Sequence, residues 1–162
     1  MKNDNAIFYW DSCLFLSYIN GEPGRSNIFE DLLDEVERNK GEVFTSTIAI
    51  VEVAYASRER LSFSLSTKIQ NQINEIWADP YISLVEFNRP IAELARQLIR
   101  DAIPNKWVLK PKDAVHLASA LWVNNNISKV NEFCTYDDGL AKYTKMIGIQ
   151  IKAPHVSPSR LL

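Results

Sequence analysis

Cysteine and long apolar runs are both scarce in this chain of 162 residues. Cys13 and Cys134 are too few for a disulfide framework and lack the spacing of zinc ligands, so we expect both to be reduced and packed. No apolar run approaches the roughly 20 residues of a membrane-spanning helix. The first residues also lack the charged start, apolar middle and cleavage site of a secretory signal. These absences predict a cytoplasmic protein without a membrane segment.

An excess of charge of one sign is also missing. The formal net charge is -2 and the sequence pI is about 5.7. This balance excludes a basic protein that coats nucleic acid. It does not exclude an enzyme that acts on phosphates, because a divalent ion can stand between an acidic site and its substrate. Any surface that binds RNA must then be local.

Short apolar runs typical of strands alternate with longer helical patterns, and 46% of the residues are hydrophobic. The expected strands are 6–10, 43–45, 82–87, 131–135 and 147–151. The expected helices are 12–20, 26–39, 46–57, 63–78, 89–102, 112–125 and 137–146. This order predicts a three-layer α/β/α sandwich with a central parallel sheet of about five strands.

The same pattern predicts one domain over residues 1–152 and an extended tail over 153–162. The stretch 46–78 is expected to hold a consecutive pair of helices with no strand between them. Thr45-Ser46-Thr47 supplies residues that favour a helix N-cap before 46–57.

Four acids stand in apolar surroundings where structure alone gives little reason for a charge. Asp11 ends the run 6–10, Glu52 interrupts an apolar helix, Asp113 opens another, and Asp137 follows a strand. Charged groups are rarely buried unless they are paired or bind metal. Four carboxylates gathered in one place would need a cation, which is the arrangement of a metal-dependent phosphoryl-transfer or nuclease site.

The predicted sheet gives two of these acids a common position. Asp11 and Asp137 both follow strands, so both should project from the edge where the carboxyl ends of parallel strands meet, the edge at which ligands bind. Glu52 and Asp113 lie on helices that can lean over that edge. The pattern alone does not prove that the four meet.

Three of the four acids also have a structural explanation. Asp11 is placed to cap the next helix, Asp113 to complement a helix dipole, and one of Asp137 and Asp138 to cap a helix. Glu52 differs, because residues three and four positions away on its helix carry no charge that pairs with it. His116, one turn after Asp113, is more often a packed or capping residue than a metal ligand.

The order of the four acids resembles that of the PIN-domain nucleases, and among them the VapC-type toxins of bacterial and archaeal toxin–antitoxin pairs. The matching segments are 9–12, 47–53, 112–121 and 133–138, and 140–151 is similar to the last helix and strand of the family. Each motif is one acid in an apolar frame, so order, spacing and context carry the resemblance together over essentially the whole chain.

The resemblance implies Mg²⁺ or Mn²⁺ held by Asp11, Asp113 and Asp137, with Glu52 as a ligand directly or through water. It implies hydrolysis of RNA phosphodiester bonds, which we expect to proceed without a covalent intermediate. It also implies a small antitoxin partner that binds a hydrophobic groove beside the acidic pocket, and a homodimer.

Further residues are expected around the acids. Ser12 and Thr135 match hydroxyl positions that support the acids, and Asp138 matches a position that is acidic in part of the family. Three basic residues near the proposed site are candidates to bind the RNA backbone: Arg25, Lys110 and Lys112.

Other readings stay open on the sequence. A phosphatase of the haloacid-dehalogenase type needs a second aspartate two residues after Asp11, and Cys13 stands there, which argues against it. A housekeeping RNA-processing nuclease of the same family and a non-catalytic PIN-like binding module are the remaining alternatives. The intact set of four acids disfavours the binding module.

Overall fold

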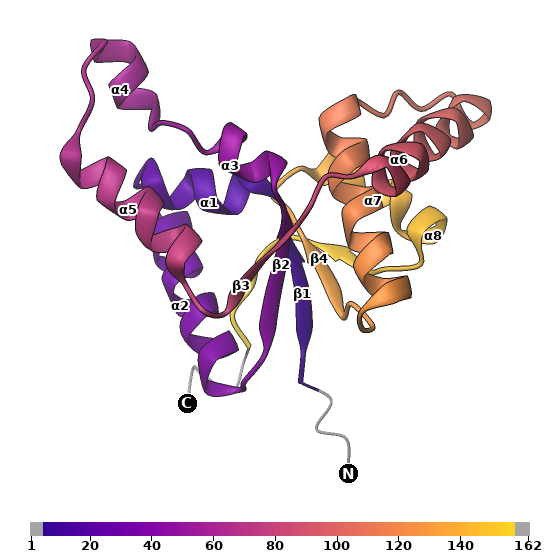
Figure 1. Ribbon diagram of the computed structural model, residues 1–162, viewed down its shortest axis with the longest axis horizontal. Helices are drawn as coiled ribbons and strands as arrows, with labels where there is room; N and C mark the ends of the chain where they lie inside the picture. Colours follow the sequence, from indigo (N-terminus) through magenta and orange to yellow (C-terminus); the bar gives the residue numbers. More distant parts are fainter. Residues whose placement is uncertain (1–4, 158–162) are drawn as a thin grey trace.

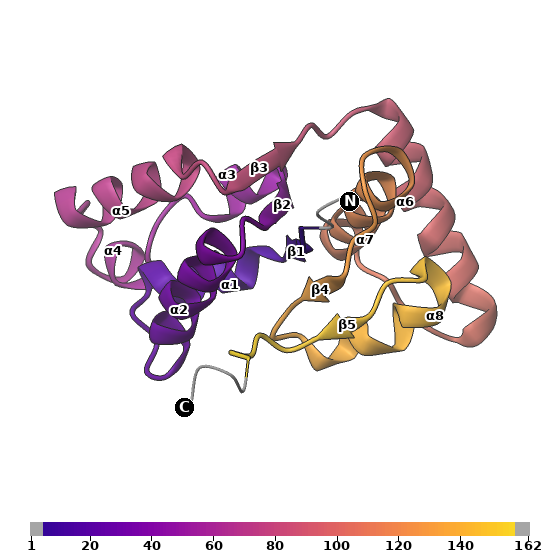
Figure 2. The same cartoon turned by 90° about the horizontal axis from the view of Figure 1, so that it is seen from below.

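A single parallel sheet forms the centre of the molecule. The computed structural model describes residues 5–157 and places the strands in the order β3-β2-β1-β4-β5, every neighbouring pair parallel (Figure 2). The strands are β1 (Ile7–Trp10), β2 (Glu42–Ser46), β3 (Ile82–Val85), β4 (Glu132–Cys134) and β5 (Ile151–Lys152). The expected sheet of about five parallel strands is confirmed.

Helices lie on both sides of this sheet. They are α1 (Ser12–Ile19), α2 (Arg25–Arg38), α3 (Ile48–Glu52), α4 (Ser57–Ser62), α5 (Thr67–Ala78), α6 (Arg89–Ala102), α7 (Pro111–Asn126) and α8 (Thr144–Ile147), with the short 3-10 helices η1 (Ile103–Asn105) and η2 (Asp138–Tyr143). Helices α1, α2 and α5 lie on one side and α6, α7 and α8 on the other (Figure 1). The predicted three-layer architecture is therefore confirmed.

The alternation of side chains along β1 explains why both faces are covered. Tyr9 belongs to the apolar core under α6 and α7, whereas its neighbour Trp10 belongs to the core under α1, α2 and α5. Trp10 packs there against Phe15 and Phe29, with ring centroids 5.9 and 5.4 Å away. A strand that buries both faces must lie in the interior of a parallel sheet.

The direction in which the strand order runs reverses between β1 and β4. The chain leaves β1 through α1 and α2 on one side of the sheet, and it reaches β4 through α6 and α7 on the other. Trp10 is in register with Cys134, and the backbone N–H of Asp11 donates to the Cys134 carbonyl at 3.0 Å. Ligands of open α/β sheets bind at such a reversal point.

The prediction of one helix over 46–57 is wrong in its second half. Helix α3 ends at Glu52, and Val53 leaves the helical region with φ -100° and ψ 43°. The next helix, α4, starts separately, because the Glu59 carboxylate accepts the backbone N–H groups of Ala56 at 3.0 Å and Ser66 at 2.8 Å. The stretch 46–78 therefore holds no strand, as predicted, but it contains three helices instead of the expected pair.

The N-cap of that helix is Thr47, within the predicted Thr45-Ser46-Thr47 segment, but Thr47 makes no side-chain capping bond. Ser46 belongs to β2, and its hydroxyl accepts the backbone N–H of Ile48 at 3.3 Å. The Thr47 hydroxyl instead accepts the backbone N–H of Phe87 at 3.1 Å, beyond the end of β3. The polar side chains at this point therefore join the ends of neighbouring strands.

Several element boundaries also differ from the prediction. Helix α5 begins at Thr67, where Ser66 caps it, instead of at 63. The last strand covers Ile151–Lys152 instead of 147–151, because Gly148 ends α8 with a positive φ of 67°. The expected helix 137–146 is η2 followed by α8.

The described part of the tail lies against α2. Residues 153–157 have no helix or strand, and both the backbone N–H and the hydroxyl of Ser157 donate to the Glu35 carboxylate. The expected tail continues over 158–162, which lie outside the described residues, as do residues 1–4. Within residues 5–157, none of the helices is long and apolar enough to cross a membrane.

Candidate functional site

Asp11 lies at the point where β1 ends and α1 begins. Its carboxylate is buried, and Oδ1 accepts the backbone N–H of Ser12 at 2.8 Å, so the capping role is real. The other oxygen, Oδ2, accepts the hydroxyl of Thr135 at 2.8 Å from the end of β4. Both predicted supporting residues, Ser12 and Thr135, therefore contact this acid.

Asp137 is positioned by the same threonine. Its backbone N–H donates to Thr135 Oγ1 at 3.0 Å, and its own Oδ1 caps η2 by accepting the N–H of Gly139 at 2.9 Å. Asp137 is exposed, as is Asp138 in the first turn of η2. Because β1 and β4 are neighbours, Asp11 and Asp137 project from the same edge of the sheet.

Asp113 reaches this edge from the first turn of α7, which Pro111 begins. Its pKa is raised by partial burial and by the negative charges of Asp11 and Asp137, and lowered less by His116 and Lys110. Three carboxyl groups from three parts of the chain therefore share one electrostatic environment. This is the arrangement in which a cation relieves repulsion.

Glu52 has a partner that its own helix does not supply. Its Oε1 lies 2.6 Å from Nε2 of His116, and its Oε2 accepts the Ser12 hydroxyl at 3.1 Å and lies 3.7 Å from Lys112 Nζ. Burial alone would raise the pKa of Glu52, but the hydrogen bond and charge of His116, with help from Ser12 and Lys112, lower it.

His116 makes a contact in the site that the sequence analysis does not predict. It is packed as expected, with 1% of its surface exposed, but its ring contacts Glu52 and stands 3.6 Å from Oδ1 of Asp11. The available signal was its position one turn after Asp113, on the buried side of α7. That spacing gives no indication of Glu52.

The three basic candidates lie around the acids. Lys112 approaches Glu52, and the charge of Lys110 lowers the pKa of Asp113. Arg25 begins α2 and stands over the ring of Tyr136, with its guanidinium carbon 4.1 Å from the ring centroid. Tyr136 directly precedes Asp137, so Arg25 borders the same edge.

The carboxylate oxygens of the site are ligands of the type that a hard divalent ion binds, although they do not surround a common point. Within residues 5–157, no three Asp, Glu, His or Cys side chains are arranged so that they could hold a metal ion as they stand. Mg²⁺ often keeps several waters and uses one or two carboxylates, so a closed protein cage is not required. The raised pKa of Asp113 beside Asp11 and Asp137 fits an anionic site of this type.

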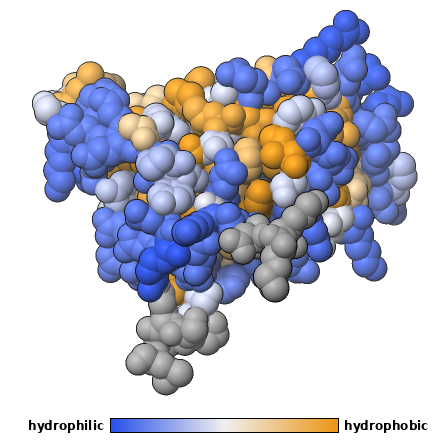
Figure 3. Space-filling view, turned by 60° about the horizontal axis from the view of Figure 1, so that its bottom comes forward, coloured by the Kyte–Doolittle hydropathy of each residue, from blue (hydrophilic) through white to orange (hydrophobic). Residues whose placement is uncertain are grey.

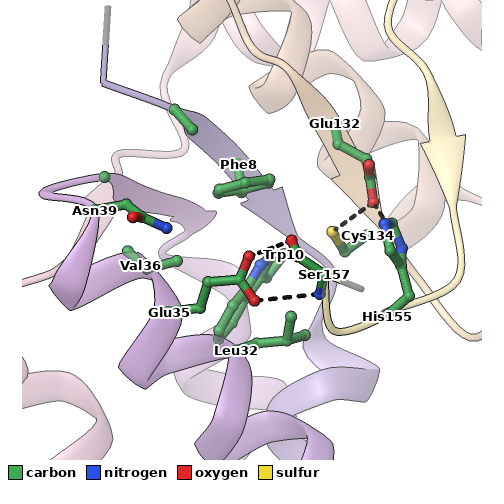
Figure 4. A pocket seen from close by; sticks show the side chains of 12 residues that line it. Phe8, Trp10, Leu32, Glu35, Val36, Asn39, Glu132, Cys134, His155 and Ser157 are labelled. Atoms are coloured by element: carbon green, nitrogen blue, oxygen red, sulfur yellow. Dashed lines mark hydrogen bonds and ion pairs between the residues drawn. The ribbon is translucent and has the colours of Figure 1, made fainter. Parts of the chain in front are cut away.

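A separate cavity lies on the side of the sheet that α2 covers. It holds about 250 Å³ and is bordered by β1, α2, β4 and the C-terminal segment (Figure 4). Glu35 and Ser157 close it on one side, and His155 Nδ1 stands 3.6 Å from Glu132 on the other. None of the four acids lines this cavity.

The fold and the site together define a class: a three-layer α/β protein with a carboxylate cluster at the reversal point of a parallel sheet. The chain belongs to the PIN-domain family, because the model of the PIN domain matches residues 8–146. The resemblance noted in the sequence is thereby confirmed. No individually curated protein sequence matches the chain.

Solved structures with the same fold come from several bacteria. VapBC2 of Rickettsia felis, bound to a promoter DNA fragment, aligns with a TM-score of 0.65 and 13% identity over 91% of this chain and 98% of that one. FitAcB of Neisseria gonorrhoeae aligns with a TM-score of 0.59 and 17% identity over 92% of this chain and 99% of that one. VapBC-5 of Mycobacterium tuberculosis aligns with a TM-score of 0.56 and 13% identity over 91% of this chain and 98% of that one. At these identities the likeness shows the fold.

Proposed function

We propose that this protein is a Mg²⁺- or Mn²⁺-dependent endoribonuclease and the toxin of a toxin–antitoxin pair. The observation that carries the proposal is that Asp11 and Asp137 project from the same edge of the sheet, beside Asp113 in the first turn of α7, whose pKa is raised by burial and then by both of their charges. Family membership supports a nuclease. The likeness in fold to VapBC proteins of Rickettsia and Mycobacterium supports a toxin.

The acids have distinct parts in this proposal. Asp11, Asp113 and Asp137 hold the ion, and Glu52 binds it directly or through water. Once bound, a divalent ion supplies a water of lowered pKa and offsets charge on the phosphate oxygens. Ser12 and Thr135 keep the Asp11 carboxylate in place. Asp138, next to Asp137, supplies an outer carboxylate.

Basic side chains on the rim favour RNA as the substrate. Lys110 and Lys112 precede and follow Pro111 at the start of α7. Arg25, at the start of α2, lies over the ring of Tyr136. Phosphate oxygens are the groups that such side chains bind. An overall charge of -2 then confines RNA binding to this local surface.

An exposed apolar surface next to Glu52 supports an antitoxin partner. Val51, Leu61 and Phe63, on α3 and at the end of α4, are 77%, 82% and 95% exposed. A groove of about 510 Å³ between α1 and α4 is bordered by Leu16, Leu61 and Glu52 itself. Apolar surface of this kind marks interaction sites, and a partner helix in the groove would reach the acids.

A second apolar area supports the expected homodimer. The edge strand β3 leaves Leu84 partly exposed, and Phe87 just beyond it is exposed as well. Hydrophobic residues gather in the upper middle of the mostly hydrophilic face in Figure 3. Light scattering after size-exclusion chromatography tests this expectation, and a monomer at micromolar concentration would contradict it.

Cleavage of labelled RNA by purified protein tests the proposed activity. Wild type, Asp11→Asn and Asp34→Asn are prepared identically, because Asp34 is an exposed acid on α2 and serves as the matched control. With Mg²⁺ or Mn²⁺, wild type and Asp34→Asn should cut RNA at internal positions, and Asp11→Asn should not. Activity that survives EDTA, or equal activity in all three proteins, would sink the proposed site.

Growth of a bacterial host tests the toxin role separately. Induction of the wild type should arrest growth, induction of Asp11→Asn should not, and co-expression of a small reading frame immediately upstream should restore growth. Cleavage in vitro without growth arrest would point to the housekeeping nuclease.

A further inference from the structure

Glu52 ends a short helix that is little buried. Helix α3 has five residues, and Ile50 and Val51 just before Glu52 are exposed. Only Ala49 within this helix and Val53 after it are buried, and neither has a polar side chain. The orientation of the Glu52 carboxylate therefore depends on side chains from other elements.

His116 makes the shortest of these contacts. Its Nε2 is 2.6 Å from Oε1 of Glu52, whereas the Ser12 hydroxyl is 3.1 Å from Oε2. A carboxylate only accepts hydrogen bonds, so the proton lies on Nε2 of the imidazole. Oε1 of Glu52 is thus bound to His116 in the buried part of α7. Oε2 faces Ser12 on α1 and Lys112 at the start of α7.

Tyr9 fixes the imidazole from the centre of the sheet. Its hydroxyl lies 2.8 Å from Nδ1 of His116. The Tyr9 hydroxyl donates to Nδ1 when the ring is neutral with its proton on Nε2, and accepts from Nδ1 when the ring is charged, so the bond holds the ring in either state. The Tyr9 ring is fully buried and stacks on Phe133 with centroids 5.1 Å apart. A chain of side chains therefore runs from β1 through α7 to Glu52.

We propose that His116, held by Tyr9, is a positioning residue that fixes Oε1 of Glu52 and leaves Oε2 as the oxygen offered to a divalent ion or its water. The inference rests on the proposed function, because the ion is what the acids would hold. His116 Nε2 also stands 3.6 Å from Oδ1 of Asp11, so the ring lies between two of the acids. Outer partners of this kind change metal affinity by about 10- to 100-fold.

Two amide substitutions separate positioning from packing. In His116→Gln the amide nitrogen extends about as far as Nε2, so it can still donate to Glu52. In His116→Asn the amide extends about as far as Nδ1, so the contact with Glu52 is lost. Both variants remove the same ring from the same buried position. Gln should keep most of the Mn²⁺ affinity, and Asn should lower it by about 10- to 100-fold.

Mn²⁺ titration calorimetry without RNA measures this difference, with melting temperatures recorded for each variant. In a Glu52→Gln background the difference between Gln and Asn at position 116 should vanish. Equal Mn²⁺ affinity of the two variants, or a difference that persists without Glu52, would overturn the inference.

Tyr9→Phe provides a second route if the substitutions at position 116 prevent folding. Phenylalanine keeps the ring and its stacking on Phe133 and removes only the hydroxyl, so a loss of Mn²⁺ affinity is expected. Unchanged Mn²⁺ affinity of Tyr9→Phe would show that Tyr9 does not position Glu52 through His116. A wild type that binds no Mn²⁺ overturns the proposed function and this inference with it, whereas wild-type binding that ignores His116 and Tyr9 overturns the inference alone.

Discussion

Thr135 donates its hydroxyl to Oδ2 of Asp11 at 2.8 Å across the ends of two neighbouring parallel strands. The same Oγ1 accepts the backbone N–H of Asp137 at 3.0 Å. One side chain therefore fixes a buried carboxylate on β1 and the chain that carries a second acid after β4. The relative placement of the two acids therefore depends on the Thr135 hydroxyl as well as on the sheet.

Thr135→Val tests that dependence, because valine keeps the shape of threonine and removes the hydroxyl. The buried Oδ2 of Asp11 loses its shorter hydrogen bond and keeps only Cys13 Sγ at 3.6 Å, which costs about 1–3 kcal/mol of folding stability. We expect a lower melting temperature and a cleavage rate reduced at least about tenfold. Thr135→Ser, which keeps the hydroxyl, is the control and should stay close to wild type. A wild-type cleavage rate in the valine variant would show that the hydroxyl does not position the acids.

Asp113→Asn should stabilise the metal-free protein at pH 7. Burial and the charges of Asp11 and Asp137 raise the pKa of Asp113 in the folded state. Its contribution to stability is therefore fully present below the ordinary pKa of about 3.9 and declines as the pH rises through the raised value. Asparagine carries no charge to be repelled. After solvent screening we expect a gain of roughly 0.5 kcal/mol, or about 1–2 °C in melting temperature.

Thermal unfolding in EDTA, followed from pH 3 to 8, measures this gain. The difference between Asp113→Asn and wild type should grow with pH, while Asp34→Asn, an exposed acid on α2, should show no such trend. Added Mn²⁺ should then stabilise the wild type more than Asp113→Asn. A variant that is less stable than wild type at pH 7 in EDTA would contradict the repulsion.

Cys13 should be unreactive in the folded protein. Burial and then the charge of Asp11 raise the pKa of its thiol to about 12, so almost no thiolate exists at pH 8. Burial raises the pKa of Cys134 as well. Dithionitrobenzoate should therefore label neither thiol until the protein unfolds. Asp11→Asn should speed the labelling of Cys13, and Cys13→Ser identifies the site. Rapid native labelling of the wild type would contradict the raised pKa.

Strand ends were the part of the site that the sequence could predict. An apolar run followed by an acid is a local pattern, and the parallel sheet places both Asp11 and Asp137 at one edge. The contact between Glu52 and His116 spans a sequence separation of 64 residues, so a search three and four positions along one helix could not find it. Side-chain partners of this kind depend on how α3 and α7 pack, which composition and periodicity do not specify.

The break between α3 and α4 was missed for a similar reason. The apolar pattern of 48–56 continues past Glu52, so periodicity favours one helix. The Glu59 carboxylate instead binds the backbone at Ala56 and Ser66, which starts a new helix and closes the following loop. The Glu59 side chain is buried in the structure, where its carboxylate accepts hydrogen bonds from the backbone.

Phe63 combines an unfavourable backbone with an exposed ring. It ends α4 in the left-handed region at φ 50° and ψ 37°, and its side chain is 95% exposed. Neither property benefits an isolated chain, since the left-handed region costs a non-glycine residue about 1 kcal/mol or more and an exposed ring gains no burial energy. Lys106 has a similar backbone, with φ 60°, but no apolar side chain.

Phe63→Gly and Lys106→Gly should therefore both raise the melting temperature, by up to about 2–4 °C for a gain near 1 kcal/mol, because each relieves the same backbone conformation. Only Phe63→Gly removes apolar surface at the end of α4, so only that variant should lower bis-ANS fluorescence and weaken rescue of growth by a co-expressed antitoxin. Melting curves, dye titration and the growth assay on the pair check these outcomes. If Phe63→Gly is stabilised but binds dye and antitoxin as wild type does, this surface is not the docking site, and the exposed ring has another purpose.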